Sequence, residues 1–158
     1  MTAPASGPQL VLGVETSCDE TAASVVADGR HTRSSVVSSQ VALHAEFGGV
    51  VPEIAGRAHL ARLVPVVRAA LAEAGVDRPA SQLAAVGATR GPGLVGALLV
   101  GLASAKALAL AWDVPFVGVN HLEGHLYASL LEDPTFDPPM VVLLASGGHT
   151  LLLSLIHI

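Results

Sequence analysis

Two histidines stand four residues apart in the segment NHLEGH, which covers residues 120–125. Four residues make about one helical turn, so on a helix His121 and His125 project from the same face. That spacing suits two imidazole ligands of one metal ion, although a catalytic metal usually takes three protein ligands. Histidines at the start of a helix are also often solvated or hydrogen-bonded. The spacing therefore leaves a metal site and an ordinary polar pair both open.

The glutamate in this segment distinguishes it from a zinc protease. In the protease motif H-E-x-x-H, the glutamate follows the first histidine directly and acts as the general base. Here Glu123 comes two residues after His121, and at about 100° per residue it points roughly away from the histidine face. A metalloprotease is therefore the least favoured function.

A second polar cluster lies near the N-terminus, in ETSCDET at residues 15–21. It places Asp19 and Glu20 at a predicted hairpin tip, beside three hydroxyl side chains. The backbone N–H groups and hydroxyls of such a turn can bind phosphate, and the carboxylates can act as a base or hold a metal. An ordinary polar turn explains the same residues, so both interpretations stay open.

Two glycine-containing segments could also meet a ligand. In ASGGHT, at residues 145–150, Gly147 and Gly148 let the backbone approach a bound molecule closely, with a plain glycine hairpin as the alternative. TRGPGLVG, at residues 89–96, leads into a predicted helix whose start could bind an anion. The alternative for this segment is tight packing of the helix on a strand.

The hydrophobic pattern predicts the elements that must position these residues. In chain order, the expected elements are strands at 9–17, 21–28 and 30–40, a helix at 52–74, a strand at 83–89, a helix at 94–112, a strand at 114–119, a helix at 120–133, and a strand–turn–strand at 140–155. Pro52 suits the first position of its helix, and Asn120 suits a helix cap. Strands that alternate with helices indicate an α/β fold with a mixed, mostly parallel sheet flanked by helices.

Composition limits the class of protein. The chain has 158 residues, of which 51% are hydrophobic and 13% charged, and its formal charge of −5 gives no reason to expect nucleic acid. Its one cysteine, Cys18, excludes an internal disulfide and fits a reducing cytoplasm. The segment 94–112 is long enough to span a membrane, but Lys106 within it and its many alanines favour a helix buried on a sheet.

Five segments occur in a fixed order: GVETSCDET, FGGVVPEIAGRAHL, TRGPGLVGALLVG, NHLEGHLYA and LLASGGHT. Together they resemble the tRNA N6-adenosine threonylcarbamoyltransferases, the TsaD family, from about Leu10 to Leu152. The resemblance implies an actin-like, sugar-kinase-like (ASKHA) fold of two lobes with a ligand cleft between them. This chain would supply the first lobe and the start of the second.

The resemblance divides the chain into four expected parts. Residues 1–8 would be a disordered tail, 9–139 the first lobe, 140–153 the opening hairpin of a truncated second lobe, and 154–158 a tail that does not match the family. Because the family continues well beyond this point, we expect the truncated chain to be inactive by itself.

The resemblance also implies an activity and its residues. Family members transfer the threonylcarbamoyl group from threonylcarbamoyl-AMP to N6 of the adenosine 3′ of the anticodon, in tRNAs that read codons beginning with A. His121 and His125 match the ligands of one divalent metal ion per subunit, Fe²⁺ with Zn²⁺ as the alternative, whose third ligand is an aspartate beyond this chain. Asp19 and Glu20 match the acidic pair of the catalytic cleft. The residues that match contacts to the adenylate are Leu144, Ala145, Ser146, Gly147 and Gly148.

The expected partners follow from the same resemblance. They are tRNA, threonylcarbamoyl-AMP and the subunits TsaB and TsaE, with a homodimer as one option, no membrane, and a cytoplasmic location. A non-catalytic scaffold subunit of the same fold is one alternative, but a scaffold has no need for two histidines at ligand spacing. An actin-like phosphotransferase that uses ATP is the other, since its nucleotide pocket would lie in the half that this chain lacks.

Overall fold

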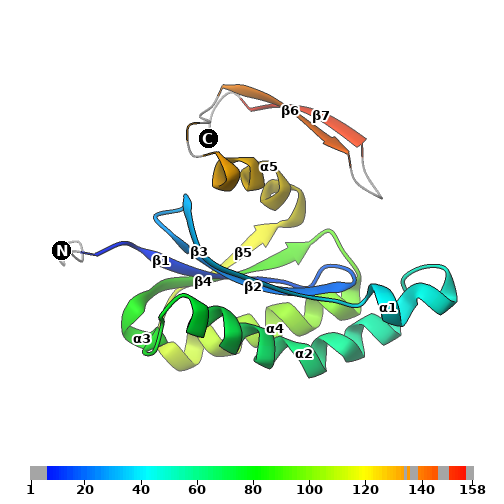
Figure 1. The fold of residues 1–158 in the computed structure, drawn as a ribbon, viewed down its shortest axis with the longest axis horizontal. Coiled ribbons are helices and arrows are strands. Elements are labelled where there is room, and N and C mark those ends of the chain that lie inside the picture. The colour runs from blue at the N-terminus through cyan, green and yellow to red at the C-terminus, as the bar shows by residue number, and fades with distance from the viewer. Residues whose placement is uncertain (1–6, 134, 136–138, 146–149, 156–158) are drawn as a thin grey trace.

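The computed structural model describes residues 7–133, 135, 139–145 and 150–155. A five-stranded sheet carries two long helices on one face, and a third helix and a two-stranded hairpin lie on its other side (Figure 1). The elements are β1 (Leu10–Glu15), β2 (Glu20–Ala27), β3 (His31–Ser39), α1 (Val41–His44), the 3-10 helix η1 (Ala45–Phe47), α2 (Pro52–Glu73), α3 (Pro79–Gln82), β4 (Leu83–Gly91), α4 (Val95–Trp112), β5 (Phe116–Asn120), α5 (His121–Glu132), β6 (Met140–Ala145) and β7 (Thr150–Leu155).

The sheet is mixed, with strand order β3-β2-β1-β4-β5. The first three strands form an antiparallel meander joined by short connections. β4 and β5 then add in parallel beside β1, each after a helical crossover, because parallel neighbours cannot be joined by a tight turn. The three parallel strands therefore end at the same edge of the sheet, which is where ligands bind in open α/β sheets.

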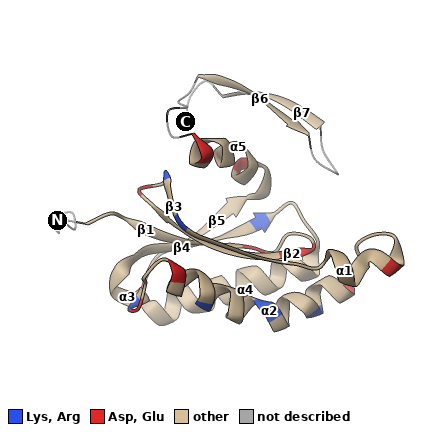
Figure 2. Ribbon diagram, in the orientation of Figure 1, with Lys and Arg blue, Asp and Glu red and all other residues tan. Residues whose placement is uncertain are grey.

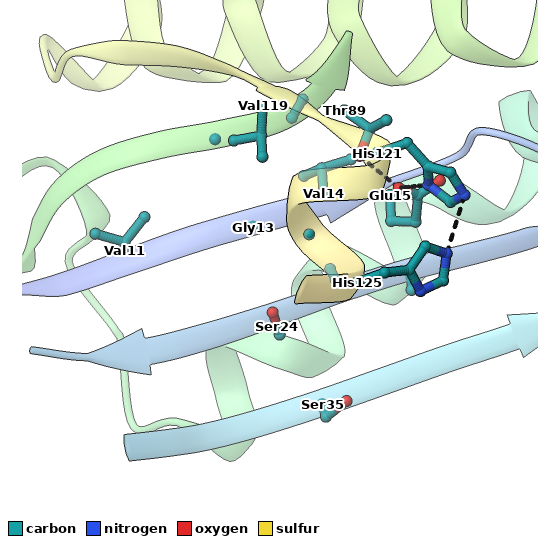
Figure 3. A pocket seen from close by; sticks show the side chains of 15 residues that line it. Val11, Gly13, Val14, Glu15, Ser24, Ser35, Thr89, Val119, His121 and His125 are labelled. Carbon is teal, nitrogen blue, oxygen red and sulfur yellow. Dashed lines mark hydrogen bonds and ion pairs between the residues drawn. The ribbon is translucent and has the colours of Figure 1, made fainter. Parts of the chain in front are cut away.

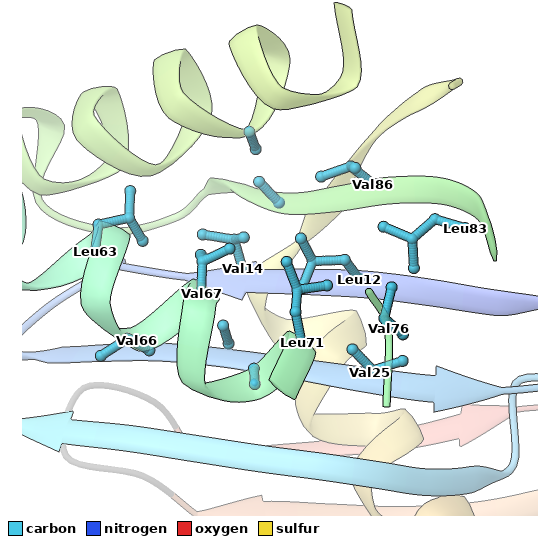
Figure 4. Packing of buried hydrophobic residues seen from close by; sticks show 14 of the residues in the cluster. Leu12, Val14, Val25, Leu63, Val66, Val67, Leu71, Val76, Leu83 and Val86 are labelled. Carbon is cyan, nitrogen blue, oxygen red and sulfur yellow. The ribbon is translucent and has the colours of Figure 1, made fainter. Parts of the chain in front are cut away.

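The hydrophobic core lies between the sheet and helix α2, with α4 closing its side (Figure 4). Alternate residues of the strands point into it, so that Leu12, Val25 and Val86 are fully buried. Leu63 and Val67, four residues apart on α2, pack against them at 2% and 5% exposure. Each such side chain stabilises the fold by about 1.5–3 kcal/mol relative to its exposed state.

Helix α4 approaches the sheet closely because its buried face is made of small residues. Ala97, Gly101, Ala105 and Ala109 recur every four residues and are all buried. By length and composition α4 could cross a membrane, but this face packs on β4 and α2. The predicted packing on the sheet is confirmed for this face, but only 28% of the helix is buried, and Val95, Leu99 and Leu110 are exposed.

Helix α5 starts directly at the end of β5. The side chain of Asn120 accepts a hydrogen bond from the backbone N–H of Leu122 at 2.9 Å, which confirms the predicted cap. His121 is therefore the first residue of the helix, held at the edge of the sheet by the strand before it.

The predicted α/β fold with a mixed sheet flanked by helices is confirmed. The expectation that this sheet is mostly parallel is wrong, because β1–β3 form a meander and parallel and antiparallel pairings are present in equal number. The short helices α1, η1 and α3 were not expected, because segments of three or four residues are too short for a helical period. β6 and β7 form the expected final pair of strands. Their assignment to a second lobe stays a prediction, as does the tail at 1–8, of which residues 1–6 lie outside the described residues.

Candidate functional site

Side chains from three parallel strands meet where those strands end. Glu15 is the last residue of β1, Thr89 lies near the end of β4, and His121 directly follows β5. They line a pocket of about 410 Å³, and the second histidine of α5, His125, lines it as well. Figure 3 shows the two imidazole rings turned toward each other beside the Glu15 carboxylate.

The two histidines face each other through their Nε2 atoms, which are 3.2 Å apart. Their rings stand edge to face, with centroids 4.5 Å apart and planes at 76°. The expectation that His121 and His125 project from one helix face is thus met. Glu123, which lies between them in sequence, is exposed and does not line the pocket.

The Glu15 carboxylate lies behind the His121 ring. It accepts hydrogen bonds from the hydroxyl of Thr89 and the backbone N–H of Ser17, and its Oε2 is 3.4 Å from Nδ1 of His121. The Ser17 hydroxyl is 3.3 Å from the same nitrogen. A carboxylate at Nδ1 favours the tautomer that carries its proton there, which leaves Nε2 with a free lone pair.

The environment of Glu15 favours its charged form. Burial raises the pKa of this carboxyl, but hydrogen bonds from Ser17 and Thr89, and then the charge of His121, lower it by more. The net result is a pKa below the ordinary value of a glutamate. Glu15 is therefore an anion at neutral pH and can only accept hydrogen bonds.

The histidine pair fits a divalent metal ion. Two nitrogens at about 2.1 Å from one ion are roughly 3.0–3.4 Å apart at octahedral or tetrahedral angles, a range that includes the observed 3.2 Å. Imidazole nitrogens suit iron and zinc. A carboxylate behind a ligand histidine is the usual outer-shell arrangement of such sites. Within the described residues, no group of three or more His, Cys, Asp or Glu side chains gathers at one point, so the pair is an incomplete ligand set.

Asp19 and Glu20 lie on the turn that leaves β1, outside the pocket lining. Asp19 is partly buried, and Glu20 is exposed at the start of β2. The turn nevertheless reaches the histidine pair, because Ser17, two residues before Asp19, contacts His121. The two acidic residues thus follow closely in sequence on a residue that contacts His121, and their catalytic role stays a prediction.

The predicted adenylate contacts fall at the end of β6. Leu144 is buried and Ala145 exposed, and neither lines the pocket. Ser146, Gly147 and Gly148 lie outside the described residues.

Gly93, just before α4, and Gly101, inside it, allow close packing on the segment after β1, the alternative that the sequence left open. A Cβ on Gly93 would collide with the backbone of Ser17, and one on Gly101 with the side chain of Thr16. The N–H of Leu94, next to Gly93, donates to the carbonyl of Ser17 at 2.8 Å. These contacts explain why small residues stand there without any bound anion.

Glu15 and Thr89 were missed as site residues by reasoning from the sequence. Glu15 lies within the quoted segment ETSCDET, yet it directly follows an apolar strand and was counted with that strand. Its position at the C-terminal end of a buried strand was the available signal, since polar residues there tend to face a ligand.

The fold of this lobe is similar to that of solved structures. YeaZ from Pseudomonas aeruginosa matches with a TM-score of 0.57 and 23% identity, over 92% of this chain and 65% of that chain. A crystal structure described as an uncharacterized protein with similarity to peptidase YEAZ, from the same organism, matches equally well over 64% of its length. These likenesses show a shared fold, and they agree with the predicted α/β fold with a mixed sheet flanked by helices.

The family follows from sequence. The family model described as TsaD: tRNA N6-adenosine threonylcarbamoyltransferase matches residues 31–156, and the chain belongs to this family. Proteins named tRNA N6-adenosine threonylcarbamoyltransferase from Trichlorobacter lovleyi and Pelobacter propionicus are 61% and 62% identical to it over 141 residues. Both matches cover 89% of this chain but only 40% and 41% of the relative. The relative from Caldicellulosiruptor saccharolyticus is 55% identical over 146 residues, which is 43% of its length. The chain thus spans about two fifths of the curated relatives it matches.

Proposed function

We propose that this chain, as part of a longer protein, transfers the threonylcarbamoyl group from threonylcarbamoyl-AMP to N6 of the adenosine 3′ of the anticodon in tRNAs that read codons beginning with A. The observation that carries the proposal is the family match over residues 31–156. The facing histidines at the pocket support it, because they offer two nitrogen ligands to a catalytic metal ion, which a purely structural lobe would not need.

The histidine pair would hold the metal. His121 and His125 offer two nitrogens to one divalent ion, Fe²⁺ with Zn²⁺ as the alternative, and a third ligand would come from outside the described residues. When bound, the ion supplies positive charge for oxygens of the acyl donor. Glu15 would orient His121, since its carboxylate faces Nδ1 and leaves Nε2 available to hold the ion.

The turn that carries Asp19 and Glu20 would accept the proton that adenosine N6 loses. As the adenosine N6 forms its bond to the carbamoyl carbon, the bond from that carbon to the AMP phosphate oxygen breaks, and AMP leaves. N6 loses one proton in this step, and Asp19 or Glu20 would accept it. Their closeness in sequence to Ser17, whose hydroxyl contacts His121, supports this assignment.

The charge distribution bears on how tRNA would bind. The chain carries 8 Lys and Arg against 13 Asp and Glu. Figure 2 shows the lysine and arginine positions distributed over several helices and strands. We therefore place most phosphate contacts outside the described residues, on the remaining part of the protein or on its partner subunits.

Partner subunits complete the proposal. TsaB and TsaE would assemble with the protein in the cytoplasm, with a homodimer as a second form. Helices α2 and α4, which contact each other, carry apolar side chains that are more than half exposed. These side chains offer such a partner a surface: Leu60, Val64, Val95 and Leu99.

The test is tRNA modification by the full-length protein with metal, donor and partner subunits. Nucleosides from the treated tRNA are separated by chromatography and identified by mass spectrometry. We expect threonylcarbamoyladenosine in a tRNA that reads an A-starting codon and none in a matched tRNA that reads another codon. No product from the intact, metal-loaded enzyme would overturn the proposal.

A non-catalytic scaffold is the second candidate, and the fold similarity to YeaZ favours it. The two candidates differ in their use of metal. A scaffold would support modification equally well after both histidines are replaced, whereas the enzyme would not.

A further inference from the structure

We propose that His59 is a positioning residue that holds, from helix α2, the turn carrying Asp19 and Glu20. The residue takes no part in the pocket, and it is fully buried. The link from this turn to catalysis rests on the proposed function. The positioning itself is carried by contacts on the described residues.

Three consecutive carbonyls of the turn are each bound by a different element. The carbonyl of Ser17 accepts from the N–H of Leu94, just before α4, at 2.8 Å. The carbonyl of Asp19 accepts from the N–H of Gln40, after β3, at 3.0 Å. Between them, the carbonyl of Cys18 accepts from Nε2 of His59 at 3.0 Å. The middle contact is the one made by a side chain, so one substitution can remove it while leaving the backbone intact.

The hydrogen-bond partners of His59 determine which of its ring nitrogens carries the hydrogen. A carbonyl oxygen can only accept, so Nε2 must carry the hydrogen that Cys18 receives. Nδ1 is then the acceptor, and the Thr21 hydroxyl donates to it at 2.8 Å. His59 therefore joins both sides of the acidic pair, because Cys18 precedes Asp19 and Thr21 follows Glu20.

A second buried histidine keeps this arrangement in place. Nε2 of His44 lies 3.3 Å from Oε1 of Gln40, and Nδ1 of His44 accepts from the N–H of Val51 at 3.3 Å. The Gln40 amide oxygen is thus turned to His44, and its NH₂ group faces Nδ1 of His59 at 3.3 Å. Buried polar groups that are all paired in this way hold one geometry, since any rotation leaves a group without a partner.

The experiment uses Cys18 as a reporter of the turn. It is exposed and is the one cysteine of the chain, so its reaction with an aromatic disulfide reagent reads a single position. Burial and the neighbouring Asp19 raise the pKa of its thiol. Loss of the His59 contact lets Cys18 shift within the turn, which relieves both effects, so the rate of reaction at fixed pH increases.

Two substitutions separate positioning from general packing. His59→Gln keeps an NH₂ group near the place of Nε2, whereas His59→Asn reaches only the place of Nδ1. We expect Cys18 in the Asn variant to react at least about threefold faster than in the parent, and in the Gln variant at close to the parent rate. The control is Leu63→Ala, one turn along the same helix, which weakens the core without touching the turn.

The Cys18 reaction rates are compared only for variants that far-UV circular dichroism shows to be folded. Equal rates in the Gln and Asn variants, or an equal increase in the Leu63→Ala control, overturn the proposal. If the Asn variant does not fold, the Gln variant decides, because a threefold increase in that variant overturns the proposal and a parent rate supports it. In the full-length protein, we expect the Asn variant to lower kcat and leave KM for tRNA within about twofold. Faster Cys18 reaction with unchanged kcat supports the positioning and contradicts the catalytic role of the turn.

Discussion

Two pairs of histidines occupy opposite situations in this lobe. His44 and His59 are 3% and 0% exposed, and hydrogen-bonding partners face all four of their ring nitrogens. His121 and His125 stand at a pocket, and their Nε2 atoms face each other. The difference teaches that a histidine's chemistry depends on what its nitrogens already bind. Nitrogens that donate to and accept from protein stabilise the fold, and nitrogens that converge across a pocket can hold an ion.

The largest effect should follow from removing the open pair. Replacing His121 and His125 by alanine in the full-length protein should abolish metal binding, measured by metal content after dialysis. The free energy of unfolding should change by only about 0.5 kcal/mol, since the side chains are partly or well exposed. His31→Ala, at the exposed start of β3, is the matched control and should retain metal. Metal at the parent stoichiometry in the double variant would contradict the assignment.

The next effect concerns the turn that joins the two pairs, because Ser17 contacts His121 and Cys18 contacts His59. Asp19→Asn or Glu20→Gln in the full-length protein should lower turnover by about 10²–10⁴ while changing tRNA affinity little. Turnover and tRNA binding are measured separately, by product formation and by filter retention. A loss confined to tRNA affinity would make these residues docking groups.

Replacing His59, one member of the buried pair, should lower the free energy of unfolding and leave metal binding unchanged. His59→Leu leaves the Thr21 hydroxyl, the Gln40 amide and the Cys18 carbonyl without their partner, and each unpaired buried group costs about 1–3 kcal/mol. We expect a loss of about 3 kcal/mol in the free energy of unfolding, measured by urea denaturation. The folded fraction should still bind metal. An unchanged urea midpoint would show that the network contributes nothing to stability.

The smallest effect should come from the carboxylate behind the open pair. Glu15→Gln keeps the size of the side chain but gives His121 a weaker acceptor. Metal affinity should fall by about tenfold, the lower end for loss of an outer-shell carboxylate. Competition with a chelator of known affinity measures the change. Affinity equal to the parent's would separate Glu15 from the metal site and reduce its role to packing of the β1 end.

The sequence predicted the order of long elements because each carries a strong period or apolar run. Helix α2 was found from apolar residues at helical spacing and from Pro52 at its start, and the structure places its first residue there. The spacing of His121 and His125 similarly predicted their shared face, because one helical turn fixes it.

Contacts between distant segments could not be predicted in the same way. Glu15, Thr89 and His121 are brought together by strand order, which no local pattern contains. His59 lies in the quoted segment FGGVVPEIAGRAHL, but its partners are 38 and 41 residues away along the chain. A buried histidine on an apolar helix face looks like any other core residue until those partners are known.

The bound carbonyls of the first turn have a consequence for local unfolding. Donors to Ser17, Cys18 and Asp19 come from three separate parts of the lobe: the start of α4, the interior of α2 and the end of β3. The turn cannot open by itself, because releasing all three carbonyls requires displacing two helices and a strand end at once. Its opening free energy should therefore approach that of global unfolding, unlike most surface turns, which open at little cost. Asp19 and Glu20 thus sit on a surface turn whose stability is tied to that of the core.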